Sequence, residues 1–63
     1  MTKREKEVIF LVANDMDNVS IAKALNISVK TAETHRRNIM LKMKAKTAAG
    51  MVAIALRTGI ISL

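Results

Sequence analysis

The chain contains no proline, and its two glycines stand at positions 50 and 59. These two residue types interrupt helices most strongly, and strong helix formers make up most of the remaining sequence. We therefore predict an all-α fold. The 63 residues have room for one domain, residues 1–63, with three or four short helices. Its hydrophobic core is close to the smallest that is sufficient without disulfides or metals.

Basic residues outnumber acidic ones by eleven to five, which gives a net charge of +6. A small basic surface favours polyanionic partners, nucleic acid first and an anionic membrane second. The longest stretch of apolar and glycine residues, AAGMVAIAL at 48–56, is far shorter than the roughly 20 residues of a membrane span. The charged N-terminus, MTKREKEV, lacks the apolar core of a signal peptide. We expect a cytoplasmic protein that does not enter a membrane.

The chain has no cysteine and a single histidine, His35. Disulfides and thiolate metal sites are therefore excluded, and one histidine is too few for an ordinary zinc site. No Cys, Asp or second His accompanies His35 as a catalytic partner, so we assign it to packing or to a hydrogen bond. We expect no catalysis, no metal and no cofactor.

Capping residues divide the chain into four helical segments. The candidate N-caps are, in chain order, Thr2, Asp17 or Asn18, Ser28 and Thr47. Glu5 stands three residues after the first of these, which predicts a capping box. The first helix is expected to end near Asn14 and Asp15, and the second near Leu25. The last is expected to end at Gly59, with Ile60 and Ile61 folding back on the core.

The third segment, SVKTAETHRRNIMLKMKAK, has an apolar and a polar side when it is drawn as a helix. The apolar arc holds Ala32, His35, Arg36, Ile39 and Met43. The opposite side carries Lys30, Thr34, Arg37 and Leu41, with Glu33 and Lys44 beside them. Between residues 28 and 46, six cations stand against one acid. This segment is predicted to be a helix of roughly four turns with a basic outer face.

Two short helices joined by a turn of about three residues, the second of them basic and rich in hydroxyls, are typical of a helix-turn-helix that reads DNA. In such an arrangement Arg37 can reach guanine acceptors, and Glu33 can accept a hydrogen bond from a cytosine amino group. Ser28, Lys30 and Thr31 stand at the helix start, where phosphate oxygens bind. The alternative is a merely solvated face, which usually alternates Glu with Lys, and this one does not.

The last helix has no polar side chain from Ala48 to Leu56. A helix on the outside of a small domain normally keeps one polar face. An apolar surface all round predicts burial on two sides, one within the domain and one against another chain.

Four stretches of the sequence match a known set of motifs in the same order. TKREKEVIFLVA resembles L-T-x-R-E-x-E-V-L-x-L-x-A, and NVSIAKALNIS resembles N-K-E-I-A-x-x-L-x-I-S. SVKTAETHRRNIMLKMKAKT resembles S-x-x-T-V-x-x-H-x-x-N-I-x-x-K-L, and AIALRTGII resembles x-x-A-x-x-x-G-L-I. From Thr2 to Ile61, the chain thus resembles the C-terminal DNA-binding domain of the LuxR/FixJ family of bacterial transcription regulators. The stretch ETHRRNIMLKMKAKT is most similar to FixJ-like response regulators.

The resemblance implies a four-helix bundle that contains a helix-turn-helix, with the third helix as the recognition helix and the fourth as a symmetric dimer contact. The base contacts that it implies are Glu33, Thr34 and Arg37. The phosphate contacts that it implies are Lys30, Thr31 and Arg36, with Lys42 and Lys46 at the edge of the site. The residues that it implies for the dimer contact are Ala49, Val52, Ala53 and Leu56.

The implied function is sequence-specific binding of double-stranded DNA by a homodimer on two half-sites about one helical turn apart. RNA polymerase is a further expected partner. Members of the family generally carry an N-terminal receiver or ligand-binding domain, and these residues contain none, so we expect an isolated output domain or a stand-alone regulator. Two other hypotheses remain from the residues alone. One is a helical interaction module that binds an acidic protein partner; the other is a cationic amphipathic peptide at membranes, against which the two acids of the first helix argue.

Overall fold

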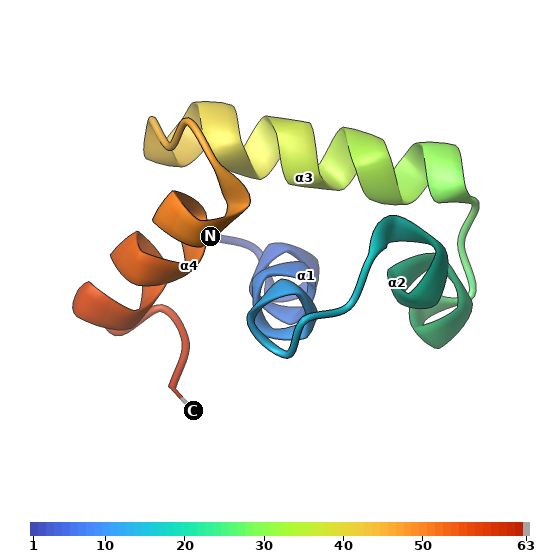
Figure 1. The fold of residues 1–63 in the computed structure, drawn as a ribbon, viewed down its shortest axis with the longest axis horizontal. Coiled ribbons are helices and arrows are strands. Elements are labelled where there is room, and N and C mark those ends of the chain that lie inside the picture. Colours follow the sequence, from blue (N-terminus) through green and yellow to red (C-terminus); the bar gives the residue numbers. More distant parts are fainter. Residues whose placement is uncertain (63) are drawn as a thin grey trace.

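Four α-helices joined by short turns make up the computed structural model, which describes residues 1–62 (Figure 1). They are α1 (Lys3–Ala13), α2 (Asn18–Leu25), α3 (Val29–Met43) and α4 (Ala48–Arg57). The longest helix, α3, lies across the other three and contacts each of them, and α1 lies between α2 and α4 (Figure 1). The predicted all-α class and the four predicted segments are confirmed.

Each helix begins at a side chain that accepts a hydrogen bond from a free backbone N–H of the first turn. The predicted capping box is present at α1, where the Glu5 N–H donates to Thr2 Oγ1 at 3.1 Å and the Thr2 N–H donates to Glu5 Oε1 at 2.8 Å. Of the two candidates for α2, Asp17 is the cap. Ser28 and Thr47 cap α3 and α4 as predicted.

A residue with left-handed backbone conformation follows each helix and turns the chain away from the helix axis. Gly59 (φ 76°) follows α4, as predicted. The residues that follow the other three helices are not glycines: Asp15 has φ 64°, and Asn26 and Lys44 both have φ 57°. Asn and Asp tolerate this conformation, whereas for most other L-residues it costs about 1–2 kcal/mol. Lys44, the C-cap of α3, is therefore the most strained of the four.

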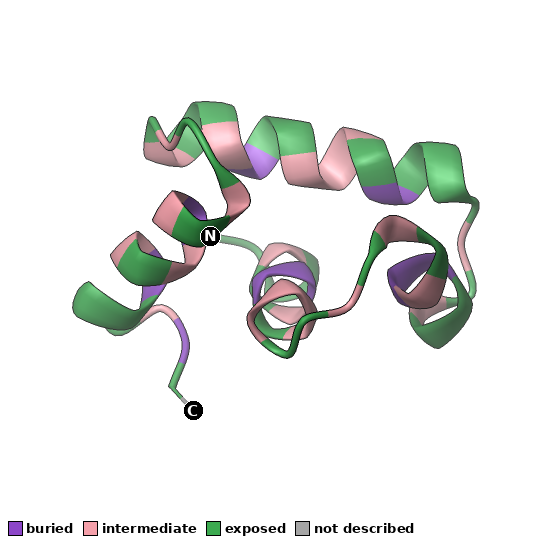
Figure 2. Cartoon of the chain, viewed as in Figure 1, coloured by how far each residue is buried: buried purple, intermediate pink, exposed green. Residues whose placement is uncertain are grey.

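The core consists of two hydrophobic clusters on either side of α1 (Figure 2). The cluster between α1, α3 and α4 contains Val8, Ile9, Ile39, Met51, Ala55 and Ile61. The cluster between α2 and α3 contains Ile21, Ala22 and Ala32. The helix α3 contributes Ile39 to the first cluster and Ala32 to the second, so both halves of its inner face pack against the core. These two residues lie on the arc predicted to be apolar.

Candidate nucleic-acid interface

The exposed face of α3 is positioned by α2, which packs against its N-terminal half. A short turn at residues 26–28 joins the two helices, and this pair forms the predicted helix-turn-helix (Figure 1). Lys30, Glu33 and Arg37 are exposed on the outer side of α3, and Thr34 is half-buried between them. Because Ala32 and Ile39 hold the opposite side in the core, this face of α3 is directed into solvent.

Hydroxyl groups at the start of α3 are already engaged in local hydrogen bonds. Ser28 Oγ accepts from the Thr31 N–H at 3.0 Å and lies 2.9 Å from Thr31 Oγ1. Thr34 Oγ1 donates to the Lys30 carbonyl oxygen at 3.0 Å, one turn earlier. These bonds order the first turns of α3. Capping leaves other N–H groups of the first turn without a partner inside the helix, and the helix dipole favours an anion there.

The two adjacent arginines of α3 differ in environment. Arg37 is exposed, whereas Arg36 is half-buried and its Nη1 donates to Asn18 Oδ1 at 2.7 Å. Asn18 is the first residue of α2, so this bond ties the two helices of the helix-turn-helix together. The sequence predicted both arginines as DNA contacts. The structure places Arg37 exposed on the outer face and gives Arg36 a partner within the domain.

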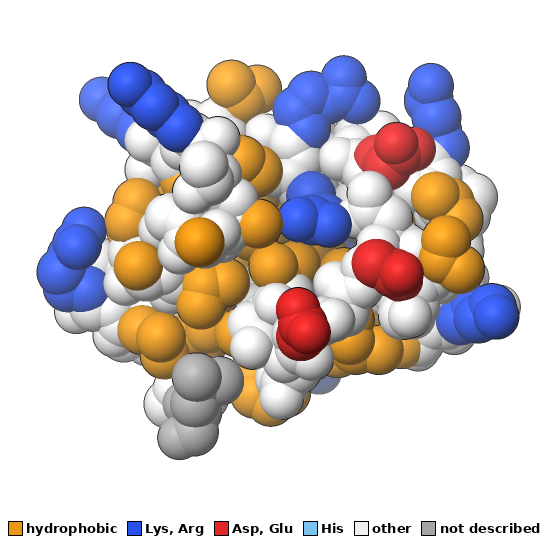
Figure 3. Space-filling model, in the orientation of Figure 1, with side chains coloured by type: hydrophobic (Ala, Val, Ile, Leu, Met, Phe, Trp, Pro, Cys, Tyr) orange, Lys and Arg blue, Asp and Glu red, His pale blue; other side chains and the backbone are white. Residues whose placement is uncertain are grey.

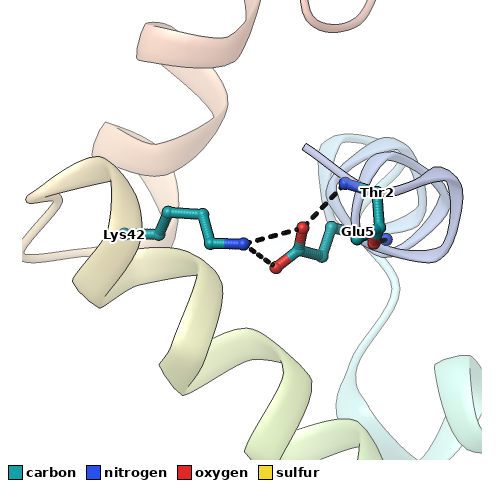
Figure 4. Close-up of polar contacts among 3 residues, drawn as sticks. All are labelled: Thr2, Glu5 and Lys42. Atoms are coloured by element: carbon teal, nitrogen blue, oxygen red, sulfur yellow. Dashed lines mark hydrogen bonds and ion pairs between the residues drawn. The ribbon is translucent and has the colours of Figure 1, made fainter.

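Lys42 points from the C-terminal end of α3 to the N-terminal end of α1 (Figure 4). Its Nζ lies 2.8 Å from Glu5 Oε2 and 3.1 Å from Glu5 Oε1. The same carboxylate accepts the Thr2 N–H in the capping box, so Glu5 joins the start of α1 to the end of α3. These hydrogen bonds, of which that from Lys42 has the largest effect, lower the pKa of Glu5 from 4.5 to about 2. Lys42, predicted as a phosphate contact, is thus paired with an acid.

This pairing predicts how stability depends on pH. The pKa of Glu5 is lowered on folding, so its stabilising effect is complete above pH 4.5 and is lost as the pH falls toward about 2. Between pH 4.5 and pH 2, the melting temperature of Glu5→Gln should therefore fall by less than that of the parent. Thermal unfolding followed by circular dichroism at a series of pH values measures the difference. Asp17, whose pKa is also lowered by the Ser20 N–H, leaves a residual pH dependence in the variant.

Glu7→Gln is the matched control, because Glu7 lies on the same helix in an exposed ion pair with Arg4 at 3.8 Å. Exposed pairs of this kind contribute little to stability. This control should keep the pH dependence of the parent. Identical pH profiles for Glu5→Gln and the parent would show that the Lys42 pair does not stabilise the domain.

Basic side chains gather along the edge of the molecule where α3 runs (Figure 3). Beside them is a shallow cavity of about 650 Å³ between the start of α2 and the outer side of α3. It is lined by Asn18, Glu33, Arg36, Arg37, Met40, Leu41 and Ala45. Glu33 and Arg37, both predicted to face bases, are therefore brought together in one concave surface. Asn18 and Ala45 were not predicted as part of this site, because only the packing of α2 and of the α3–α4 turn against α3 places them there. Met40 and Leu41 lie on α3 itself and were not predicted as part of the site either.

The remaining predicted cations lie toward the two ends of this edge. Lys30 is exposed near the start of α3, and Lys46 is exposed in the turn before α4. Among residues 1–62, neither of them has an acidic partner of the kind that Lys42 has. Both remain available to a polyanion.

One side of α4 is left apolar and exposed. Met51 and Ala55 are buried against α1 and α3, while Ala49 and Ala53 are exposed and Leu56 is 40% exposed. The residue Val52, which was predicted with them, is half-buried and packs against the core. Three of the four predicted dimer residues therefore lie at the surface, and the fourth is shared with the core.

Most of the chain matches a known protein family. The family described as bacterial regulatory proteins, luxR family, matches residues 1–55, which include the whole helix-turn-helix and most of α4. The chain belongs to the luxR family. Its helix-turn-helix is that of a transcription regulator that binds DNA, and the site is not that of an enzyme. The resemblance predicted from the four motifs is confirmed.

Several regulatory proteins of bacteria are similar to the chain over nearly its full length. The transcriptional regulatory protein MctR of Rhizobium johnstonii is 40% identical over 62 residues, which are 98% of this chain and 29% of MctR. The transcriptional regulatory protein FixJ of Rhizobium meliloti is 44% identical over 59 residues, 94% of this chain and 29% of FixJ. The response regulatory protein YgeK of Escherichia coli is 42% identical over 60 residues, 95% of this chain and 41% of YgeK. The chain thus spans less than half the length of these relatives.

None of the helices within residues 1–62 is both long enough and apolar enough to span a bilayer. The most apolar helix, α4, has 10 residues.

Proposed function

We propose that this luxR-family domain binds double-stranded DNA sequence-specifically, with α3 in the major groove. The observation that carries the proposal is the exposed pair Arg37 and Glu33 in one concave surface, on a helix whose opposite side is fixed in the core. A guanidinium that projects from such a helix can donate to guanine O6 and N7, and a carboxylate can accept from cytosine N4. The cations along the same edge supply the attraction to phosphates.

The contacts divide into those that read bases and those that position the helix. Glu33, Thr34 and Arg37 form the base-reading set. The phosphate set comprises Ser28, Lys30, Thr31, Arg36, Lys42 and Lys46. Within the phosphate set, Lys30 and Lys46 have no side-chain partner among residues 1–62, whereas Arg36 and Lys42 have partners inside the domain. We propose that Arg36 keeps Asn18 and offers its remaining donors, and that Lys42 contributes charge while it stays paired.

Selection of bound sequences from a random duplex pool, followed by salt titration, tests this function. A recovered site should bind more tightly than random duplex at every salt concentration, and affinity should fall linearly with salt on logarithmic axes. Equal binding to the recovered site, random duplex and heparin would contradict the proposal. That outcome would favour a module that binds an acidic protein partner.

The division of contacts makes a separate prediction. Arg37→Ala should weaken binding to the recovered site by about 1–3 kcal/mol and relax base preference at one position of the half-site. Lys30→Ala, a matched removal of a cation from the same face, should weaken binding to the recovered site and to random duplex alike. Fluorescence anisotropy with both duplexes measures the two effects. Equal loss of preference in both variants would show that Arg37 does not read a base.

We further propose that the domain acts as a homodimer through the exposed side of α4, with the set Ala49, Val52, Ala53 and Leu56 at the contact. Three of these residues expose apolar surface next to the core, which a second copy of the same face would cover. A symmetric dimer presents its two α3 helices to half-sites about one helical turn apart, so the recovered site should be palindromic.

The relatives suggest the role of the whole protein. FixJ and MctR are transcriptional regulatory proteins, and YgeK is a response regulatory protein. We propose that residues 1–63 form one DNA-binding domain with the output role of a response regulator in a two-component system. On this proposal the bound domain influences transcription through contact with RNA polymerase in the cytoplasm.

A further inference from the structure

The most exposed large hydrophobic side chain of residues 1–62 belongs to Leu41, which is 71% exposed. The next is Val19, at 49%. A single leucine on a protein surface is common and has no meaning by itself. Leu41 has an unusual place, because it lies on the outer side of α3 and lines the same shallow cavity as Glu33 and Arg37.

The surroundings of Leu41 are basic. Arg37 precedes it by one helical turn on the same face, and Lys44 follows it in the sequence. Figure 3 shows hydrophobic and basic side chains next to one another along the edge where α3 runs. An apolar protein partner would have to bury several cations beside Leu41, whereas a polyanion would neutralise them. Charge complementarity therefore favours DNA as the partner of this face.

We propose that Leu41 reads thymine by contact with its C5-methyl group, an inference that rests on the proposed placement of α3 in the major groove. The thymine methyl is the one methyl group that the standard base pairs present in that groove. A branched aliphatic side chain ends in methyl groups that can pack against the thymine methyl. The same side chain cannot form a hydrogen bond with any base edge. Leu41 thus adds an apolar contact to the polar readers Glu33 and Arg37.

Helix geometry predicts which base Leu41 meets. Four residues of α-helix rise about 6 Å, and base pairs are stacked about 3.4 Å apart. A helix that lies along the groove therefore places Leu41 about two base pairs beyond the base that Arg37 contacts. Recognition helices of homeodomains read bases from positions that span two helical turns. Thr34 and Leu41 are likewise about two helical turns apart along α3.

The test removes the methyl group and the leucine separately and together. Each thymine of the recovered site is replaced in turn by deoxyuridine, which lacks only the methyl, and binding to the 63-residue chain is measured for the parent and for Leu41→Ala. At one position in each half-site, the replacement should weaken binding of the parent by about fourfold and leave binding of Leu41→Ala unchanged. That position should lie about two base pairs from the one that loses preference in Arg37→Ala.

Controls separate this contact from other effects. Phe10→Ala removes an exposed apolar side chain from α1, outside this cavity, and should show the same cost of deoxyuridine as the parent. Leu41→Met keeps an apolar side chain, so replacing thymine by deoxyuridine should weaken its binding nearly as much as it weakens that of the parent. If no thymine shows a cost that depends on Leu41, while the parent still prefers its site, the inference is wrong and the proposed function stands. If the parent has no preferred site, both are wrong.

Discussion

Replacing Ile39 by Ala is expected to destabilise the domain by about 2–5 kcal/mol, because it removes three buried carbons and leaves a cavity. Ile39 is 0% exposed and packs with Val8, Ile9 and Met51 between three helices. A domain of this size rarely has more than about 3–5 kcal/mol of stability. Much of the variant should therefore be unfolded at room temperature, with a large loss of helical circular dichroism and of cooperative thermal unfolding.

The control for this variant lies two residues away on the same helix. Leu41→Ala makes the same kind of truncation at a side chain that is 71% exposed, and its free energy of unfolding should change by less than about 0.5 kcal/mol. Both variants introduce alanine into α3, so helix propensity does not favour one over the other by much. A folded Ile39→Ala with parental melting temperature would show that the cluster around Ile39 is not the main core.

Leu56→Glu is expected to abolish the proposed dimerisation and to weaken binding to a palindromic duplex by about 100-fold, because the second half-site no longer adds to the affinity of the first. Leu56 is 40% exposed in the single chain, and a carboxylate at its tip can reach water. In a dimer the same carboxylate would be buried against an apolar face without a partner, which is strongly unfavourable. Sedimentation and binding to duplexes with one or two half-sites measure the two effects.

Phe10→Glu is the control, since Phe10 is 44% exposed and belongs to α1 rather than to the proposed contact. It should sediment as the parent does and should bind both duplexes with parental affinity. Binding of Leu56→Glu to a single half-site should also be close to that of the parent. A Leu56→Glu variant that still prefers two half-sites over one would place the dimer contact elsewhere.

The helices were predictable because their ends depend on local chemistry. The capping box of Thr2 and Glu5, the caps Ser28 and Thr47, and the left-handed Gly59 are each defined by a few neighbouring residues. The periodicity of α3 also predicted its buried side, since side chains three and four residues apart share a helix face.

The partners of the basic residues were not predictable in the same way. Lys42 pairs with a residue 37 positions earlier, and Arg36 bonds to one 18 positions earlier. Helical periodicity indicates the direction of a side chain from its own axis, but it does not indicate which helix end lies opposite. Both cations were therefore assigned to phosphates. The structure shows that each of them holds two helices together, whereas Arg37 is exposed on the outer face of α3.

The left-handed Lys44 at the end of α3 implies a compromise between folding and charge. Glycine would adopt φ 57° there without strain, so this lysine makes the folded chain less stable than it could be. It also places an exposed cation at the end of α3, where it adds to the positive charge of the outer face of that helix. The domain thus has less stability than a glycine at this position would allow, and in exchange its surface carries one more positive charge.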